Sequence, residues 1–323
     1  MSSSLDGETP ASAALPSQTT RLGVLGLGAM GEPMAQNLLA ARGGDLVVQA
    51  RSPRPALVAA GATWADTPRE LAARADAILV MLPDLPQLEA ALDGPDGLIA
   101  GTARGDDLLL MIGSTSSPTG VRELAARLAA VPGRRIEVVD CPVSGGVDGA
   151  TAGTLSIMIG GNEDAAARAA ALLSPCGTPV HLGPLGAGEV AKACNQLVVA
   201  ATITALGEAS ELAARSGIDL DTLWTLLGGG YAGSNLLTSR KDRLVAGDDS
   251  PSGAAKYMVK DLRFAADVAR ATGIRPALIP ALQGIFDEIV DAGLGDHDIA
   301  VTRRLTAGRH TNPAAAGADY AES

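Results

Sequence analysis

Lys192 is the residue in this 323-residue chain that is best suited to acid–base chemistry. The chain contains 21 arginines but only four lysines, and no lysine precedes Lys192. It lies in the alanine-rich segment GAGEVAKACNQLVVA, which begins at Gly186 and carries Asn195 and Gln196 one turn later. A desolvated lysine can exchange a proton near neutral pH, which an arginine cannot do. A surface ion pair with Glu189, three residues earlier on the same expected helix, is the alternative explanation.

A glycine-rich loop, GLGAMG, follows the first expected strand and opens a helix expected from Glu32 to Ala41. The first glycine of a GxGxxG loop permits a tight turn, the second lets the backbone approach a pyrophosphate, and the third lets the helix pack on the strand. The helix N-terminus then faces the negative charge. Chance could space three glycines this way, but the strand–loop–helix context predicts dinucleotide binding. The expected cofactor residues here are Gly26, Leu27, Gly28, Ala29, Met30 and Gly31.

The end of the second expected strand indicates which dinucleotide is bound. An acid there would bind a ribose hydroxyl, whereas a cation favours the 2′-phosphate of NADP(H). Asp45 precedes the strand, and the strand is followed by Arg51, with Arg54 nearby. We therefore expect NADP(H), with NAD(H) still possible. The alternative is that both arginines are merely solvated.

A second glycine-rich loop, DCPVSGGVDGATAGTL, runs from Asp140 to Leu155 after another expected strand. Ser144, Gly145 and Gly146 can present a hydroxyl and successive backbone amides to a carboxylate at the sheet edge where open α/β sheets bind ligands. The loop thus suggests a site for a small anionic substrate. A plain turn into the next strand is the alternative.

Alternating apolar runs and helical patterns predict an α/β fold with a doubly wound parallel sheet of six or seven strands over residues 21–183. The segment GPLGAG at Gly183 marks the expected boundary with an all-helical domain over residues 184–308. We expect a disordered leader over residues 1–20 and a loose tail over 309–323. The expected strands are Leu22–Leu25, Leu46–Gln49, Ala77–Leu82, Leu108–Ile112 and Ile136–Val139, with Leu155–Ile159 and Val180–Leu182 less clear. The expected long helices are Glu189–Arg215, Ala254–Ala271 and Pro276–Asp291.

Composition limits the partners. The net charge of −11 argues against nucleic acid and anionic membranes, which need clustered positive charge. The three cysteines are widely spaced and are expected to be buried, and the three histidines are too scattered for a zinc site, so we expect no metal. The N-terminus lacks a basic start followed by an apolar stretch, and the longest apolar run, residues 197–206, is about half a membrane span. We expect a cytoplasmic protein.

Several motifs occur together and in order. They are GLGAMGEPMAQNL at Gly26, MLP at Met81, STSSP at Ser114, DCPVSGGVDGATAGTL at Asp140, GAGEVAKACNQ at Gly186 and KDL at Lys260. Over about residues 21–306 this set resembles the β-hydroxyacid dehydrogenase family, which includes 3-hydroxyisobutyrate dehydrogenase and tartronate semialdehyde reductase. The resemblance implies an N-terminal Rossmann domain, a C-terminal all-α domain and NAD(P)-dependent interconversion of a small β-hydroxy acid and its semialdehyde.

The resemblance also implies roles for individual residues. Lys192 would be the general acid and base, Asn195 would orient the substrate, and the loop from Ser144 to Gly146 would bind its carboxylate. We expect Gln196 and Ser234 to bind the substrate as well. A nearby Lys260 would lower the pKa of Lys192 by repulsion between like charges. The helical domain would form a homodimer or homotetramer. The remaining cofactor residues implied are Arg51, Ser52, Leu82, Pro83, Thr115 and Lys260.

Some positions depart from the family pattern. Gln196 replaces a second Asn, Ile112 stands where Asp is common, Gly253 replaces a bulky aromatic residue, and Ala300 replaces a Ser. A small residue at Gly253 suggests a looser pocket and a substrate other than the best-known C4 acids. The rival functions are an imine reductase of the same architecture, which Lys192 argues against, and a non-catalytic cofactor-binding protein. An oxidative decarboxylase similar to 6-phosphogluconate dehydrogenase would need a longer helical domain.

Overall fold

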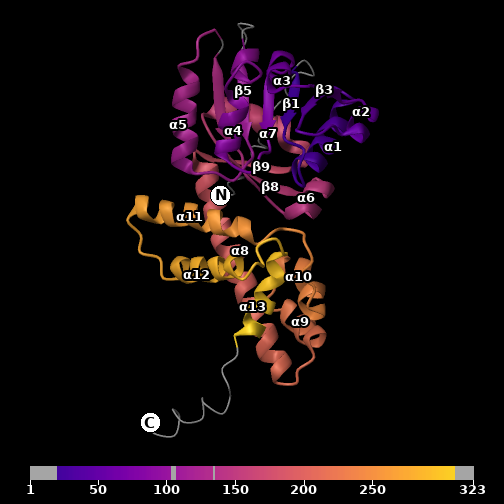
Figure 1. Ribbon diagram of the computed structural model, residues 1–323, viewed down its shortest axis with the longest axis vertical. Coiled ribbons are helices and arrows are strands. Elements are labelled where there is room, and N and C mark those ends of the chain that lie inside the picture. The colour runs from indigo at the N-terminus through magenta and orange to yellow at the C-terminus, as the bar shows by residue number, and fades with distance from the viewer. Residues whose placement is uncertain (1–19, 103–106, 134, 310–323) are drawn as a thin grey trace, which may run out of the picture.

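The computed structural model describes residues 20–102, 107–133 and 135–309. A sheet domain with helices on both faces is followed by a helical domain, and the long helix α8 (Ala187–Arg215) runs from one into the other (Figure 1). The predicted class, a Rossmann-type domain followed by an all-α domain, is confirmed. Strand β9 ends at Gly183, so the expected domain boundary falls between this strand and α8.

The described residues form one sheet with the strand order β3-β2-β1-β4-β5-β6-β8-β7, and β9 pairs with β8. Strands β1 to β6 are parallel, whereas β8 runs antiparallel to β6 and β7. The expectation of six or seven strands was too low, because β3 and β7 have two residues each and show no periodicity. The strands are β1 (Leu22–Leu25), β2 (Leu46–Gln49), β3 (Thr63–Trp64), β4 (Ala77–Val80), β5 (Leu108–Ile112), β6 (Ile136–Asp140), β7 (Val143–Ser144), β8 (Leu155–Gly160) and β9 (Gly177–Gly183).

Two aliphatic cores lie on the two faces of this sheet. One contains residues of α1 (Gly31–Arg42), α2 (Pro55–Ala59), α6 (Gly146–Ala152) and α7 (Glu163–Leu173), and the other contains residues of α3 (Pro68–Arg74), α4 (Leu85–Leu92) and α5 (Pro118–Ala129). The sheet is therefore doubly wound. The strand order reverses direction beside β1, and ligands of such sheets bind at the carboxyl ends of the strands near this reversal.

Helix α8 is the central element of the helical domain. It packs against α10 (Asn235–Ala246), α11 (Lys256–Thr272), α12 (Leu278–Asp291) and α13 (Thr302–Gly308), while α9 (Leu220–Gly228) contacts its far end (Figure 1). By length and composition alone α8 is apolar enough to cross a membrane, but the core helix of a soluble protein meets the same test. Short 3₁₀ turns occur at Ile99–Gly101, Ser174–Cys176 and Ile299–Val301.

Some details differ from the sequence-based expectations. Cys141 and Cys176 are buried as expected, but Cys194 is exposed, because it lies on the outer side of α8. Most of the expected leader and tail, residues 1–19 and 310–323, lies outside the described residues. Arg309, which was assigned to the tail, instead pairs with Glu288 of α12.

The first turn of α8 lies directly against β8. A Cβ added at Gly188 would overlap the backbone carbonyl of Met158 and approach the carboxylate of Asp140 at 2.9 Å. A Cβ added at Gly160 would approach the Ala187 nitrogen at 2.8 Å. Glycine is therefore required on both sides of this contact, because any side chain would push helix and strand apart.

Gly188→Ala should lower the free energy of unfolding by about 1–3 kcal/mol, because overpacking forces α8 away from β8. Gly284→Ala is the matched control in α12, where an added Cβ meets nothing within 4 Å. This control should raise the free energy of unfolding by roughly 0.5–1 kcal/mol, since alanine favours helix. Urea unfolding measures both, and equal stability of Gly188→Ala and the wild type would contradict the close helix–strand contact.

Candidate active site

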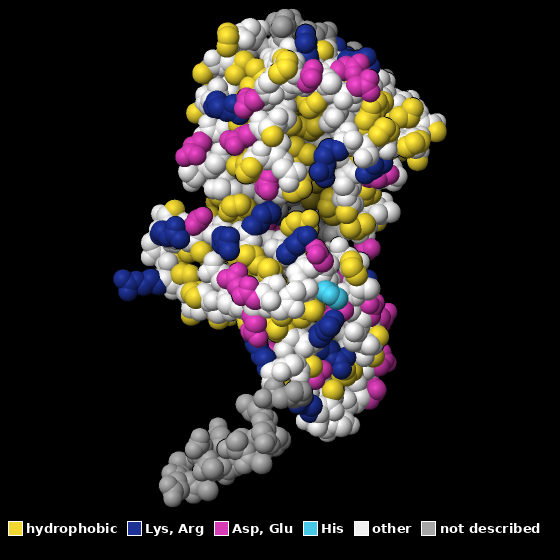
Figure 2. All heavy atoms as spheres, in the orientation of Figure 1, with side chains coloured by type: hydrophobic (Ala, Val, Ile, Leu, Met, Phe, Trp, Pro, Cys, Tyr) yellow, Lys and Arg dark blue, Asp and Glu magenta, His cyan; other side chains and the backbone are white. Residues whose placement is uncertain are grey.

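Most of the residues singled out in the sequence lie where the carboxyl ends of the sheet strands face α8 and α11. The segments after β1, β4, β5 and β6 all begin at this edge of the sheet. On the face shown in Figure 2 the surface is hollowed where the two domains join, and Lys and Arg side chains border the hollow. This is the location that an anionic ligand and a nucleotide cofactor would need.

Asp140 fixes the position of α8. It is the last residue of β6 and is fully buried, and its two carboxylate oxygens accept hydrogen bonds from the N–H groups of Gly186 and Glu189, both at 2.7 Å. Burial raises the pKa of this carboxyl, while the bonds from the helix N-terminus oppose that rise. The carboxylate therefore caps α8 and carries the helix onto the sheet edge.

Lys192 lies in the second turn of α8 with only 8% of its surface exposed. Its ammonium donates to the backbone carbonyl of Val143, within the second glycine-rich loop, at 2.9 Å. Burial lowers the pKa of Lys192, the charges of Asp261 and Glu189 raise it, and Lys260 lowers it further. The predicted effect of Lys260 therefore has the right sign, but burial is the larger cause.

The surface ion pair between Lys192 and Glu189 that the sequence allowed is wrong, because both residues are buried. Glu189 is 1% exposed, and one of its oxygens accepts from the Ser116 N–H at 3.0 Å, while the other has no hydrogen-bond partner. Burial and the nearby Asp140 raise the pKa of Glu189 well above its ordinary value. A buried carboxyl thus lies between Lys192 and the loop after β5.

Asn195 and Gln196 belong to a series of side-chain hydrogen bonds that begins at Ser144. The segment Ser144–Gly146, which is expected to bind the substrate, is called the substrate loop below. Ser144 Oγ donates to Asn195 Oδ1 at 3.0 Å, and Asn195 Nδ2 donates to Gln196 Oε1 at 2.9 Å. Gln196 Nε2 then donates to Asp261 Oδ2 at 2.6 Å. Gln196 was predicted to contact substrate, but the structure shows both ends of its amide bonded within the protein.

The same series of hydrogen bonds continues from Asp261 to two residues that are expected to line the cofactor. Lys260 Nζ donates to Asp261 Oδ1 at 3.0 Å and to the backbone carbonyl of Thr115 at 2.9 Å. Thr115 lies in the segment that follows β5, and Lys260 lies on α11 of the other domain. The structure therefore brings Lys260 and Thr115 together, as the predicted shared site requires.

The loop predicted to bind a carboxylate has the backbone that such a loop needs. Ser144 ends the short strand β7, and Gly145 and Gly146 have φ angles of 136° and 64°, which side chains disfavour. Both glycines are exposed. Their amides lie next to the carbonyl that holds Lys192, so an anion bound here would approach the lysine. The one O–H of Ser144 is donated to Asn195 and not to this position.

The first glycine-rich loop fits a dinucleotide. Gly26 has a φ of 96°, and a Cβ at either Gly26 or Gly31 would overlap neighbouring backbone. Gly28, in contrast, is exposed, and an added Cβ there meets nothing within 4 Å. Its bare backbone is accessible to a pyrophosphate at the N-terminus of α1. Of the other residues of this loop, Leu27 is buried, Ala29 is exposed, and Met30 packs on the core.

The two arginines after β2 have different surroundings. Arg54 is bonded to the Glu32 carboxylate at 2.9 Å and to the Leu27 carbonyl at 3.0 Å, so it supports the glycine-rich loop. Arg51 and Ser52 are both exposed. Arg51 is therefore the better placed of the two cations for a phosphate on the cofactor ribose.

The segment after β4 lies beside the segment after β5. The Leu82 N–H donates to Ser114 Oγ at 3.1 Å, and the exposed Pro83 follows. Leu82, Pro83 and Thr115 thus border the same edge of the sheet as the glycine-rich loop. Ile112, the departure at the end of β5, is fully buried in the core.

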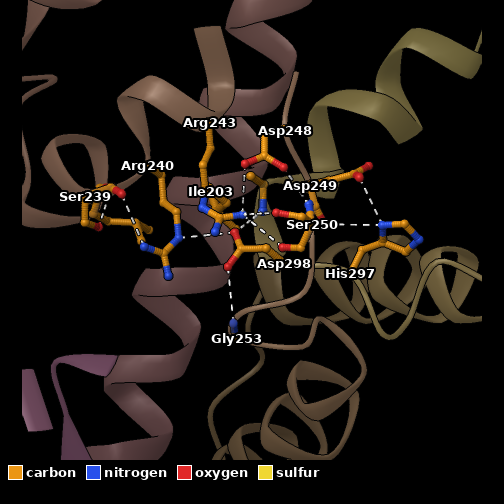
Figure 3. A network of polar contacts seen from close by, with 12 residues as sticks. Ile203, Ser239, Arg240, Arg243, Asp248, Asp249, Ser250, Gly253, His297 and Asp298 are labelled. Atoms are coloured by element: carbon orange, nitrogen blue, oxygen red, sulfur yellow. Dashed lines mark hydrogen bonds and ion pairs between the residues drawn. The ribbon is translucent and has the colours of Figure 1, made fainter. Parts of the chain in front are cut away.

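Three other predicted positions have structural contacts in the helical domain. The Ser234 hydroxyl caps α10 by accepting from the Leu237 N–H at 3.0 Å. Gly253 and Ala300 donate their N–H groups to the buried carboxylate of Asp298, which also faces Arg240 (Figure 3). The predicted substrate contact of Ser234 and the predicted effect of Gly253 on the pocket are therefore not supported by these contacts.

The histidines differ in their surroundings. His297 lies 3.0 Å from a carboxylate oxygen of Asp249, a partner that the sequence did not reveal (Figure 3). His181 bonds the backbone carbonyls of Gly161 and Gly183. His310 lies outside the described residues. The two described histidines therefore have structural contacts.

Two acids of the site, Asp140 and Asp261, were not predicted from the sequence. Each stands in a motif that was quoted, at the start of DCPVSGG and in the middle of KDL, but no periodicity shows that it is buried. A signal was nevertheless present for Asp140. An acid that ends a strand just before a glycine-rich loop can reach the free N–H groups of a nearby helix.

Two known protein families match this chain. Residues 21–186 match the family described as the NAD binding domain of 6-phosphogluconate dehydrogenase. Residues 186–305 match the family described as NAD-binding of NADP-dependent 3-hydroxyisobutyrate dehydrogenase. Together the two families cover almost all of the described chain and divide it at the start of α8.

Individual relatives cover the same length. The chain is 34% identical to 2-hydroxy-3-oxopropionate reductase of Escherichia coli, over 83% of this chain and 90% of the relative. It is 34% identical to NAD-dependent L-serine dehydrogenase of Pseudomonas aeruginosa, over 88% and 97% of the two chains. The crystal structure of 3-hydroxyisobutyrate dehydrogenase from Salmonella typhimurium superimposes with a TM-score of 0.79, at 31% identity over 88% of this chain and 99% of the other. The chain therefore belongs to the β-hydroxyacid dehydrogenase family and is an NAD(P)-dependent oxidoreductase.

Proposed function

We propose that this enzyme interconverts a small carboxylate-bearing semialdehyde and its β-hydroxy acid, with Lys192 as the general acid and base. The observation that carries the proposal is the buried ammonium of Lys192, held 2.9 Å from the Val143 carbonyl beside the loop from Ser144 to Gly146. A substrate whose carboxylate is bound by that loop would have its aldehyde carbonyl near Lys192. Relatives named 2-hydroxy-3-oxopropionate reductase and 3-hydroxyisobutyrate dehydrogenase support this class of substrate.

The side chains can perform the proton transfer. A lysine ammonium has three N–H donors, and the Val143 carbonyl takes one of them, so others remain for a substrate oxygen. In the direction of reduction, Lys192 gives its proton to the carbonyl oxygen as that oxygen becomes a hydroxyl. In the reverse direction, the neutral amine takes the proton back. Burial lowers the pKa of Lys192, so that at a given pH more of the lysine is in this neutral form. Bound NADP(H) or NAD(H) would supply or accept the hydride.

Lys192→Ala should lower kcat for a semialdehyde substrate about 10²- to 10⁴-fold, the usual loss of a general acid. Binding of NADPH, followed by nicotinamide fluorescence, should be unchanged, because Lys192 lies on the substrate side. The assay is NADPH and NADH oxidation against small semialdehydes, glyoxylate and cyclic imines. Turnover of imines instead of carboxylate-bearing substrates, or full activity of the variant, would contradict the proposal.

We propose NADP(H) as the preferred cofactor, with Arg51 facing the 2′-phosphate. The support is the position of this exposed side chain just after β2, where a cation favours the phosphate. Arg54 is less suited, since it is held by Glu32 and Leu27. The guanidinium of Arg51 can bind a phosphate through two N–H groups at once.

Arg51→Ala should lower kcat/KM with NADPH about tenfold, as expected for a charged hydrogen bond worth about 1.5 kcal/mol, and should leave NADH turnover nearly unchanged. Arg54→Ala is the matched control, and it should weaken both cofactors, because Arg54 supports the glycine-rich loop. Steady-state kinetics with both cofactors measure these effects. A wild-type enzyme that prefers NADH would contradict the proposal.

We also propose that the helical domain assembles into a homodimer or homotetramer. Large apolar side chains are exposed on α8 and α9, with Val198 63%, Leu212 71% and Leu226 73% exposed. Exposed apolar surface of this kind often marks contact with another chain. The cytoplasmic location and the absence of nucleic-acid and membrane partners stay predictions from the sequence.

Light scattering at micromolar concentration should give a mass of two or four times the 32.4 kDa chain. Leu226→Asp should shift the population toward the monomer if this side chain is covered in the assembly. The exposed Arg263→Asp is a control on α11 that changes charge without removing apolar surface. A wild-type monomer would refute the assembly.

A further inference from the structure

Asp261 is a buried acid that none of the roles above requires. It lies on α11 and is 5% exposed, and its two carboxylate oxygens have different partners. Oδ2 accepts from Gln196 Nε2 at 2.6 Å, and Oδ1 accepts from Lys260 Nζ at 3.0 Å. One carboxylate therefore bonds a residue on the substrate side and a residue on the cofactor side.

The hydrogen bonds that run from Asp261 through Gln196 and Asn195 to Ser144 form the substrate arm. Asp261 fixes which groups donate and which accept along this arm. An ionised carboxylate can only accept, so Gln196 must turn its NH₂ group to Asp261 and its Oε1 to Asn195. Asn195 then presents its own NH₂ group to Gln196, which leaves Asn195 Oδ1 to accept from the Ser144 hydroxyl. The charge of one residue thus fixes the orientation of two amides and of a hydroxyl in the substrate loop.

The hydrogen bonds that Lys260 makes to Asp261 and Thr115 form the cofactor arm, which is shorter. Lys260 has only N–H donors, and two of them are directed to Asp261 and to the Thr115 carbonyl. Its side chain remains 27% exposed. Asp261 therefore orients a cation beside Thr115, which is expected to line the cofactor.

We infer that Asp261 is a positioning residue that joins the two halves of the active site, orienting Asn195 and Ser144 through Gln196 and orienting Thr115 through Lys260. The inference rests on the proposed function, because it assigns the two arms to substrate and cofactor. It also explains the departure at Gln196, since a glutamine has the length to bridge Asn195 and Asp261.

The charge of Asp261 has a second consequence. Lys192 is surrounded by Glu189 from its own helix, by Asp261 and Lys260 from α11, and by the Val143 carbonyl from β7. Burial and Lys260 lower the pKa of Lys192, whereas Asp261 and Glu189 raise it. Removing the charge of Asp261 should therefore lower the pKa of Lys192, so that its ammonium is lost at a lower pH.

Asp261→Asn tests both consequences. The variant should lower kcat about tenfold or more and should move the alkaline limb of the reduction profile by about half a unit to one unit toward lower pH. It should also weaken NADPH binding by about threefold or more in nicotinamide fluorescence titrations. Asp267→Asn makes the same change on the same helix at a side chain that is 51% exposed, and it should leave all three unchanged.

Gln196→Met removes only the substrate arm and keeps the length of the side chain. It should raise KM for the carboxylate substrate while leaving NADPH affinity and the alkaline limb as in the wild type. Thermal unfolding of each variant shows whether it is folded, and Gln196→Met, which buries no new charge, carries the test of the substrate arm if Asp261→Asn does not fold.

The outcomes separate the two proposals. If the wild type turns over no carboxylate-bearing substrate, the proposed function fails. If in that case Asp261→Asn still binds NADPH more weakly than the wild type while Asp267→Asn does not, the cofactor arm of the inference stands. If Asp261→Asn matches Asp267→Asn in pH profile, KM and NADPH affinity, the inference is overturned. A KM for Gln196→Met equal to that of the wild type would overturn the substrate arm.

Discussion

The active site depends on one buried carboxylate at the end of β6. Asp140 holds the N–H groups at the start of α8, and through them it sets where the second turn of that helix lies. The glycines at 160 and 188 allow helix and strand to approach closely enough for those bonds to form. This contact acts together with the Lys192–Val143 and Ser144–Asn195 hydrogen bonds to fix α8 relative to the substrate loop, which belongs to the other domain.

Acidic and basic side chains lie close together around this contact. Two lysines, Lys192 and Lys260, lie among Asp140, Glu189 and Asp261. Each buried ion is costly alone and becomes tolerable when others of opposite sign and backbone hydrogen bonds surround it. Within this arrangement burial and Lys260 lower the pKa of Lys192, while Asp261 and Glu189 raise it, so the opposing effects partly offset each other.

The two halves of the site are connected by side chains as well as by the backbone. Polar groups link Ser144 to Thr115 across α8 and α11, so the substrate loop and the segment after β5 cannot move independently without breaking a hydrogen bond. Both loops belong to the sheet domain, yet the groups that join them come from the helical domain. The helical domain is therefore part of the active site.

Patterns of residues that lie close together in the chain were enough to predict much of the structure of this protein. The GxGxxG loop and the alternation of strands and helices predicted the fold, and the isolated Lys192 indicated a candidate site, because each depends on residues close together in the chain. Tertiary structure alone decided that Glu189 is buried rather than on the surface, that Asp140 caps α8, and that Asp261 bridges two loops. These contacts join residues far apart in sequence, and burial and hydrogen-bond direction exist only once the two domains have packed.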